Sequence, residues 1–316
     1  MKSEMVLAHR RVRLKKDGRL LRYWQNRYLL LLLIPGLVYY FIFHYMPMYG
    51  IQIAFKNYFF RMGISGSPWV GFEHFKDMFA LESFWQVFRN TFLISLYKFI
   101  FGFPAPILFA ILLNEVRQAK LKKVVQTISY LPHFISWVVL GGLMVQFLSP
   151  SIGPINTLIK TMGADPVYFL ADPKWFRTVL VATSMWKGVG WGSIIYLAAL
   201  SGIDPSLYEA SYIDGANRFQ RILYITIPSL APVITIMLIF ALRGIVQDDF
   251  DQIFNLYNPA VYNVGDVLST YTYRRGLVDM QYSFSTAVGL FKNLLAFVFI
   301  IAANSIAKRI NEYGIW

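Results

Sequence analysis

Six runs of apolar residues recur along the chain, each about as long as a helix needs to cross a bilayer core of roughly 30 Å. They cover residues 28–48, 90–113, 124–148, 176–200, 231–247 and 284–306. Polar and charged residues gather between the runs, as is typical of loops at the membrane surface. The pattern predicts an all-α integral membrane protein with six transmembrane helices.

Composition supports membrane integration. Of the 316 residues, 56% are hydrophobic and only 15% are charged, which is too apolar for an ordinary soluble domain. The chain has no cysteine, so disulfides and thiolate metal sites are excluded. The first apolar run follows nine basic residues but is too long for a signal peptide and lacks a small-residue cleavage site. We therefore expect a basic segment over 1–27 and a transmembrane domain over 28–316.

The basic residues predict an orientation. The segments 1–27, 116–123, 201–230 and 307–316 hold 17 Lys and Arg, whereas the other three loops hold 7 together with 10 acids. The positive-inside rule places the richer set, including both termini, in the cytoplasm. Topology and anionic lipid account for the net charge of +13, so no nucleic-acid partner is expected.

One cytoplasmic loop, 204–228, has helical spacing. Asp204 suits an N-cap with Pro205 at the first helical position, and a helix over 207–213 is expected to end at Gly215 through a positive φ. Helical spacing resumes over 216–225, and Pro228 is expected to mark the entry to the next span. Such a helix, turn and helix facing water predicts a protein partner.

The loop also resembles the cytoplasmic loop of permease subunits of binding-protein-dependent ABC importers, whose pattern is EAA, three residues, G, nine residues, I, one residue, L, P. The spacing is kept here, with Ser211 for the second Ala and Ile227 for Leu, in Glu209-Ala210-Ser211, Gly215 and Ile225-Thr226-Ile227-Pro228. The stretches SYLPHFISWVVLGG, WKGVGWGSIIYLAAL and GSPWVGFEHF are similar to the subgroup that imports complex oligosaccharides and polysaccharides, alginate importers among them.

The resemblance implies a type I ABC importer permease of the bacterial inner membrane that works by alternating access. Its implied partners are two cytoplasmic ATPase subunits that use ATP and Mg, a second permease that is usually a different chain, and an extracytoplasmic solute-binding protein. The residues implied to couple to the ATPase are Glu209, Ala210, Ser211, Asp214, Gly215, Ile225 and Pro228.

The chain itself is not expected to be an enzyme or to bind a cofactor. It lacks the G-x-x-x-x-G-K-[ST] loop that cradles phosphates, and Gly188, Gly190 and Gly192 lie in an apolar run, where small residues permit helix contact. The four histidines are scattered, with no H-E-x-x-H or paired spacing, whereas a membrane enzyme such as a glycosyltransferase would need a placed base or metal ligands. An ion-coupled secondary transporter would be expected to carry intramembrane acids, and none is clear here.

The substrate prediction rests on cations inside the apolar runs. Lys98, Lys187, Arg243 and Lys292 lie deep without acids beside them, and an unpaired cationic set favours an anionic, uronate-rich sugar. Lys187 also fits a structural role, the partner permease could supply carboxylates, and neutral oligosaccharides remain the alternative. Arg89 and Arg177, at external helix ends, are expected to snorkel to headgroups. The candidate pathway residues are Lys98, Trp186, Lys187, Arg243 and Lys292.

Two external segments have more than one interpretation. Residues 71–88 place phenylalanines on one helical face, which suits a helix on the membrane surface or a helix packed on the bundle. The loop 248–283 has five acids and is expected to dock the binding protein or line an outer gate. Its Asp248-Asp249-x-Asp251 cluster only weakly suggests a metal, because acidic loops are usually solvated.

Overall fold

The computed structural model describes residues 26–244 and 248–311. Residues 1–25 of the basic segment predicted over 1–27 lie outside the described residues. Within the described ranges the chain is helical, and the extended pairing is confined to an isolated bridge between Lys56 and Trp69. The chain divides into two units, Met1–Gln52 and Ile53–Trp316.

The first unit is one apolar helix that continues a few residues beyond the boundary. It consists of α2 (Arg27–Tyr40), a π-helical turn (Phe41–Tyr45) and a 3₁₀ segment (Met46–Phe55), 29 residues in all. The predicted span over 28–48 is confirmed as helix. Pro35 lies inside α2, and apolar residues lie on all sides of this helix, which suits a membrane span.

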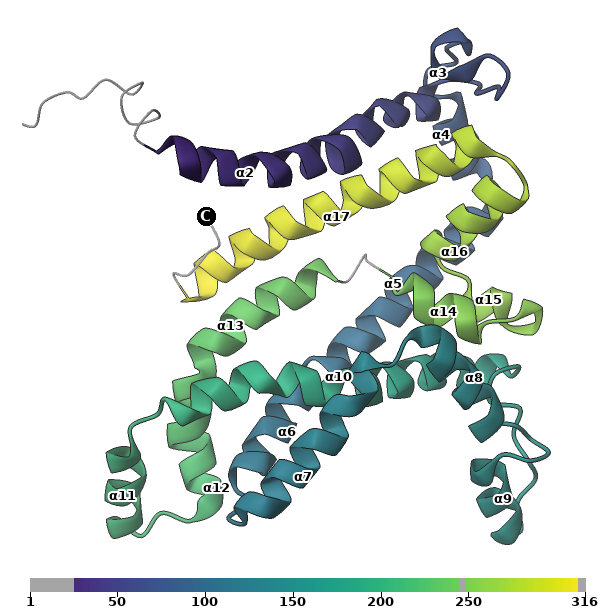
Figure 1. Ribbon diagram of the computed structural model, residues 1–316. Coiled ribbons are helices and arrows are strands. Elements are labelled where there is room, and N and C mark those ends of the chain that lie inside the picture. Colours follow the sequence, from purple (N-terminus) through teal and green to yellow (C-terminus); the bar gives the residue numbers. More distant parts are fainter. Residues whose placement is uncertain (1–25, 245–247, 312–316) are drawn as a thin grey trace, which may run out of the picture. The chain divides into compact units, whose positions relative to one another are not determined.

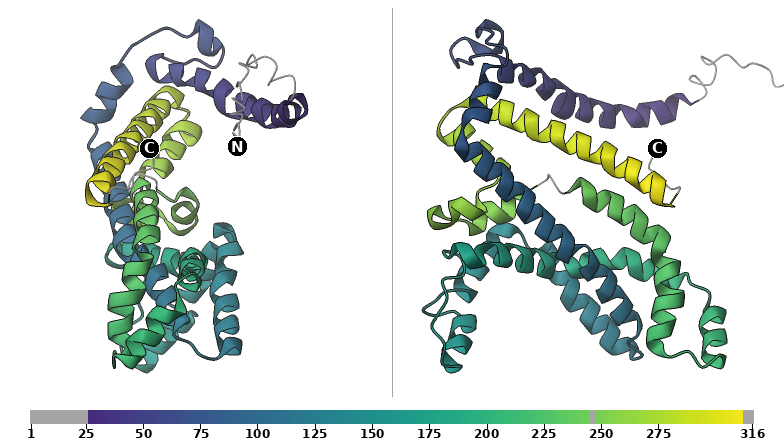
Figure 2. Two further views of the ribbon diagram at one scale, coloured as in Figure 1. Left: turned by 90° about the vertical axis from the view of Figure 1, so that its left-hand side faces the viewer. Right: turned by 180° about the vertical axis from the view of Figure 1, so that it is seen from behind.

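Long helices form the framework of the second unit (Figure 1). α5 (Glu82–Gly102) is followed by α6 (Pro104–Asn114), and α10 (Pro173–Ser201) packs against both. α12 (Arg218–Arg221), a π-helical turn (Ile222–Thr226) and α13 (Ile227–Arg243) form a continuous helix, and α17 spans Tyr282–Asn311. Figure 2 shows α5 and α6 running from α4 (Glu73–Ala80) towards the end at which α11 (Pro205–Ile213) and α12 lie.

The predicted third span, 124–148, is bent rather than one continuous helix. The chain forms α7 (Ala119–Tyr130), a 3₁₀ turn (Leu131–Phe134) and α8 (Trp137–Phe147), and the two parts are bent by 106°. Pro132 lies in the 3₁₀ turn, and Ser136 begins α8 by accepting a hydrogen bond from the Val139 N–H at 3.4 Å. A second helix, α8, therefore begins within the apolar run.

Among the described residues, four helices are long and apolar enough to cross a membrane, or five if the bent α7–α8 pair is one span. They are Arg27–Phe55, Glu82–Asn114, Arg218–Leu242 and Tyr282–Ala302. The run predicted over 176–200 is helical in α10, but α10 is not among the four. The run predicted over 231–247 ends with α13 at Arg243, before residues 245–247, which are not described. The count of six spans stays a prediction.

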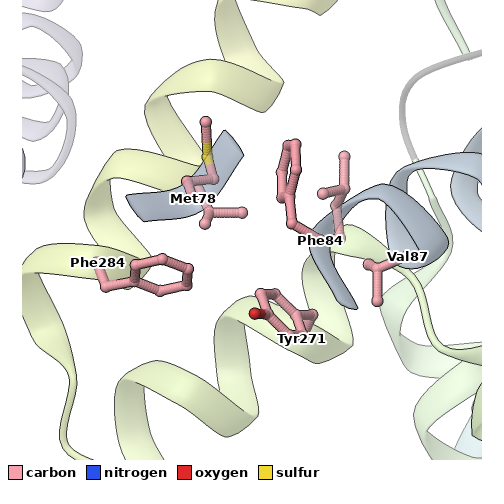
Figure 3. Packing of buried hydrophobic residues seen from close by; sticks show 7 residues of the cluster. Met78, Phe84, Val87, Tyr271 and Phe284 are labelled. Atoms are coloured by element: carbon pink, nitrogen blue, oxygen red, sulfur yellow. The ribbon is translucent and has the colours of Figure 1, made fainter. Parts of the chain in front are cut away.

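The segment 71–88 forms two helices, because α4 ends at Ala80 and α5 begins at Glu82. Both pack into a cluster that joins α4 and α5 to α16 (Leu268–Tyr273) and α17, and Figure 3 shows Met78, Phe84, Val87, Tyr271 and Phe284 within it. Phe75 and Phe88 lie against this cluster. The structure therefore favours a packed cap over a helix lying freely on the membrane surface.

Two further clusters hold α10 in place. One joins Ile94 of α5 and Phe176 of α10 to Ile253 of α14 (Phe250–Leu256). The other joins Ala110 of α6, Tyr196 of α10 and Leu230 of α13. Short helices complete the unit: α3 (Gly63–Gly66), α9 (Pro154–Thr161), a 3₁₀ turn (Pro259–Val261), α15 (Tyr262–Gly265) and a π-helical turn (Arg274–Val278).

Candidate functional site

The α11–α12 hairpin, residues 204–226, has the predicted local structure. Asp204 caps α11 by accepting a hydrogen bond from the Ser206 N–H at 2.9 Å, and Pro205 opens the helix. The hydrogen bonds from Ser206 lower the pKa of the exposed Asp204 carboxyl below its ordinary value. Gly215 has a φ of 77°, which a residue with a Cβ adopts only with strain, so glycine ends α11 as expected.

The second helix of the hairpin starts independently of the first. Asn217 and Gln220 form a capping box, in which the Asn217 side chain accepts from the Gln220 N–H at 2.9 Å and the Gln220 side chain accepts from the Asn217 N–H at 2.8 Å. Pro228 does not break the helix: it lies in α13 just after the π-helical turn Ile222–Thr226, within the continuous helix Arg218–Leu242. Ile225 and Pro228 are therefore on the next span rather than in the turn.

The residues matched to the EAA pattern lie on α11 and the turn. Glu209, Ala210 and Asp214 are exposed, and the Ser211 hydroxyl donates to the Tyr208 carbonyl at 2.8 Å. The Tyr208 hydroxyl lies 3.0 Å from the Thr226 hydroxyl, which ties α11 to the second helix. Glu209 and Ala210 are therefore exposed on α11, while the contact between Tyr208 and Thr226 holds α11 against the second helix.

Large apolar side chains at the hairpin are exposed. Ile213 is 85% exposed, and Tyr212, Phe219 and Tyr224 are each more than 70% exposed. They lie within one short hairpin that also carries charged residues, and an exposed apolar patch rimmed by polar residues marks an interaction surface.

A second feature is a charged cluster formed where Asp248 and Asp249 precede α14. The Asp248 carboxylate is 1% exposed, pairs with Lys292 of α17, and accepts from the Ser269 N–H of α16 at 2.8 Å. A buried carboxylate is stable only when charge and hydrogen-bond partners replace water, and Asp248 has both. This residue links α16 and α17.

Asp249 and Gln252 together do the equivalent for α5 and α10. It lies 3.9 Å from the Lys98 ammonium, and Lys98 also donates to the Gln252 side chain. The Gln252 amide in turn donates to the Leu180 carbonyl at 2.7 Å and to the Thr183 hydroxyl at 2.8 Å, both on α10. Asp248, Asp249 and Gln252 therefore link α5, α10, α16 and α17 around α14.

The prediction that the deep cations are unpaired is wrong for Lys98 and Lys292, because acids from this chain's own 248–283 loop neutralise them. From the sequence alone these acids are expected to be solvated, to dock the binding protein, to line an outer gate or to bind a metal. In the described residues no group of three ligands fits a metal ion, and Asp248 and Asp249 are engaged with lysines. One signal in the sequence could have predicted these pairs. A lysine within an apolar run needs a partner, and because no acid lies near it in sequence, the partner must come from a distant segment.

Lys187 has a different partner. Its ammonium donates to the carbonyls of Pro132 at 3.2 Å, His133 at 3.0 Å and Ile135, which lie at the bend between α7 and α8. The chain breaks its helical hydrogen bonds there, and carbonyls freed by the break need donors. These contacts support the structural interpretation of Lys187. Neighbouring Trp186 is 46% exposed, and the Arg243 side chain lies outside the described residues.

A cavity of about 530 Å³ lies between α5, α6, α10 and α13. The Lys98–Asp249 pair lies in its wall, and Gly188, Gly192 and Tyr196 line its α10 side. Of the candidate pathway residues, Lys98 lines this cavity, whereas Trp186, Lys187 and Lys292 are not among its described lining residues. The structure does not gather that set at one place.

The three glycines of α10 differ. A Cβ on Gly190 would lie 2.1 Å from the Ser129 carbonyl oxygen, and a Cβ on Gly192 would lie 3.1 Å from Pro106, so both permit helix contact as predicted. A Cβ on Gly188 would meet nothing within 4 Å. Gly188 therefore borders open space in the cavity rather than another helix.

Arg177 is also placed differently from the expectation. Its guanidinium donates to the Val264 carbonyl at 3.1 Å and to the Asn90 side chain at 2.8 Å, so it links α10 to α15 and α5. Snorkelling to headgroups is therefore wrong as its main role.

Comparison with known proteins identifies the family. Residues 102–312 match the family model of the binding-protein-dependent transport system inner membrane component. The chain belongs to this family. The resemblance noted in the sequence is thereby confirmed, and the relatives with named functions are transport permeases rather than enzymes.

Two relatives of this permease come from Bacillus subtilis (strain 168). Protein LplB is 42% identical over 92% of this chain and 92% of its own length. The polygalacturonan/rhamnogalacturonan transport system permease protein YteP is 40% identical over 96% of this chain and 94% of its own length.

Solved structures support the permease fold. A chain of a bacterial ABC transporter involved in the import of the acidic polysaccharide alginate is 42% identical, with a TM-score of 0.87 over 93% of this chain and 100% of that one. A second structure of a bacterial alginate ABC transporter, in complex with an alginate pentasaccharide-bound periplasmic protein, gives a TM-score of 0.86 at the same identity, over 93% of this chain and 98% of that one. The all-α importer permease fold predicted from sequence is confirmed.

Proposed function

We propose that this chain is the transmembrane permease subunit of an ATP-driven importer that moves acidic oligo- or polysaccharide across the bacterial inner membrane by alternating access. The observation that carries the proposal is the match, at a TM-score of 0.87 and 42% identity, to a transporter that imports an acidic polysaccharide. A relative whose name specifies polygalacturonan, a polymer of uronates, points to the same substrate class.

Energy is supplied by partner subunits in this proposal. The α11–α12 hairpin exposes Tyr212, Ile213 and Phe219 beside Glu209, and this mixed surface suits a groove on a cytoplasmic ATPase that binds ATP and Mg. Two ATPases, a second permease of different sequence and an extracytoplasmic solute-binding protein complete the importer. The hairpin and both termini then face the cytoplasm, as the basic residues indicate.

The substrate class no longer rests on the deep cations. Lys98 and Lys292 are paired with Asp249 and Asp248, so they add little net charge to a pathway. The neutralised cavity is the specific observation that favours the second candidate, a permease for neutral oligosaccharides.

The decisive experiment uses the whole importer in proteoliposomes, with its binding protein, and measures ATP hydrolysis and uptake. The substrates are an alginate oligosaccharide, an oligogalacturonate and a neutral oligosaccharide of similar length. Stimulation by either uronate oligomer and not by the neutral one supports the proposal. Stimulation by the neutral sugar alone would replace it with the second candidate.

A further inference from the structure

A second hollow, of about 690 Å³, lies between α5 and α10 near the first turns of α10. Tyr97 and Phe101 of α5 form one side, and Lys174, Arg177 and Thr178 of α10 form the other. In the proposed orientation this is the extracytoplasmic end of α10, where substrate released by the binding protein would arrive.

The hollow carries positive charge that the described residues do not neutralise. Lys174 is exposed and forms no ion pair with any described residue. The Asp172 side chain caps α10 by accepting a hydrogen bond from the Lys174 backbone N–H at 2.9 Å. Arg177 bonds the neutral oxygens of Asn90 and Val264, which orient the guanidinium without cancelling its charge. This is the opposite of the cavity, where Lys98 faces Asp249.

The hollow and the cavity are adjacent along α10. Val181 and Met185 line both, so one stripe of α10 runs from Lys174 and Arg177 past these two residues to Gly188. Gly188 borders open space in the cavity. A ligand that binds at the cations therefore has a route onwards along the same helix.

The chemistry of the hollow fits a uronate ring. An arginine and a lysine recognise a carboxylate through charge-assisted hydrogen bonds. Arg177 uses Nε and Nη2 to bond Val264 and Asn90, so Nη1 is the nitrogen left to donate to a ligand. Tyr97 is 37% exposed and Phe101 is 55% exposed, so aromatic surface is available for the apolar face of a sugar. A phospholipid headgroup would use the same cations, but the route towards the Lys98–Asp249 pair favours a ligand that travels inwards.

We propose that Lys174 and Arg177 form an anion-recognition point that selects carboxylate-bearing sugars as they enter the cavity along α10. This inference rests on the proposed function, because it assumes that the importer carries uronate oligomers. It assigns selectivity to the exposed Lys174 and the half-buried Arg177 at the entrance rather than to the buried lysines.

The test compares Lys174→Gln with Lys160→Gln in the whole importer, using alginate oligosaccharide delivered by the binding protein at subsaturating concentration. Lys160 is a matched control, since it is an exposed lysine of the same 149–175 loop that lines neither space. We expect Lys174→Gln to slow uptake about fivefold at low salt, as the loss of one exposed charge contact predicts. The difference should shrink as salt rises, because salt screens exposed charges. Lys160→Gln should match wild type.

Each other outcome overturns the inference. Equal uptake by the two variants, or a loss in Lys174→Gln that does not change with salt, would show that Lys174 does not select the anion. A loss seen only in vesicles containing phosphatidylglycerol, and absent in phosphatidylcholine, would assign the cations to lipid. Uptake by wild type is measured first. If wild type takes up no uronate oligomer, the proposed function fails together with this inference, whereas a failure seen only in the variants overturns the inference alone.

Discussion

The charged cluster around Asp248 and Asp249 and the α11–α12 hairpin break the ordinary rule of burial in opposite directions. The cluster buries charge: the Asp248 carboxylate is 1% exposed, and its partners all come from this chain. The hairpin exposes apolar surface: Ile213 is 85% exposed. Buried charge that is fully partnered belongs to the subunit's own fold, whereas exposed apolar surface points to a partner subunit.

The largest expected effect comes from breaking the buried pair. Asp248→Ala leaves the Lys292 ammonium without its carboxylate and should destabilise the chain by about 3 to 5 kcal/mol. Adding Lys292→Met should restore most of this loss, because an apolar residue replaces the unpaired charge. Denaturant unfolding in detergent checks both variants. Equal stability of wild type and Asp248→Ala would show that the pair is not structural.

Lys187 extends the comparison to a cation whose partners are neutral. Lys187→Met removes the donor to the carbonyls at the α7–α8 bend and should destabilise the chain by about 1.5 to 3 kcal/mol. It should also broaden the distribution of angles between α7 and α8. Because the chain has no cysteine, spin labels at Val124→Cys and Val145→Cys, both exposed, can measure the distance across it. An unchanged distance distribution would contradict the structural role.

Substitutions in the hairpin should affect binding to a partner subunit rather than the stability of this chain. Ile213→Asp should weaken association with the ATPase subunit by about 2 kcal/mol, or roughly thirtyfold, because it places a charge in the centre of an apolar contact. Its unfolding midpoint should equal that of wild type. Co-purification and substrate-stimulated ATP hydrolysis measure the association with the ATPase subunit. A lower unfolding midpoint would instead show that Ile213 contributes to the stability of this subunit.

A smaller effect is expected at the turn. Gly215→Val should cost about 1 to 2 kcal/mol locally, since φ is 77° there, and Gly215→Asn should cost less because asparagine tolerates this conformation. Substrate-stimulated ATP hydrolysis of the importer should fall in the order wild type, Asn, Val. If Val behaves like Asn, the turn does not set the coupling geometry.

Local features were predictable from the sequence because each depends on neighbours in the chain. The Asp204 cap, the helix over 207–213 and the positive φ of Gly215 all follow from capping and backbone rules, and the structure confirms them. Glu209 and the other matched residues are placed as the pattern implies, but their coupling role stays a prediction. Most apolar runs are single helices for the same local reason, and the run over 124–148 is the exception because Pro132 and the Ser136 cap end one helix and start another.

The sequence by itself determined the membrane class, the helices and the hairpin, since composition and spacing act over a few turns of chain. Only the tertiary structure decided the roles of the charges. Lys98 and Asp249 are far apart in sequence, as are Lys292 and Asp248, and no periodic pattern reports such a contact. The same holds for Arg177, which folding directs to Asn90 and Val264. A charge within an apolar run must find a partner, but the packing of helices determines which one.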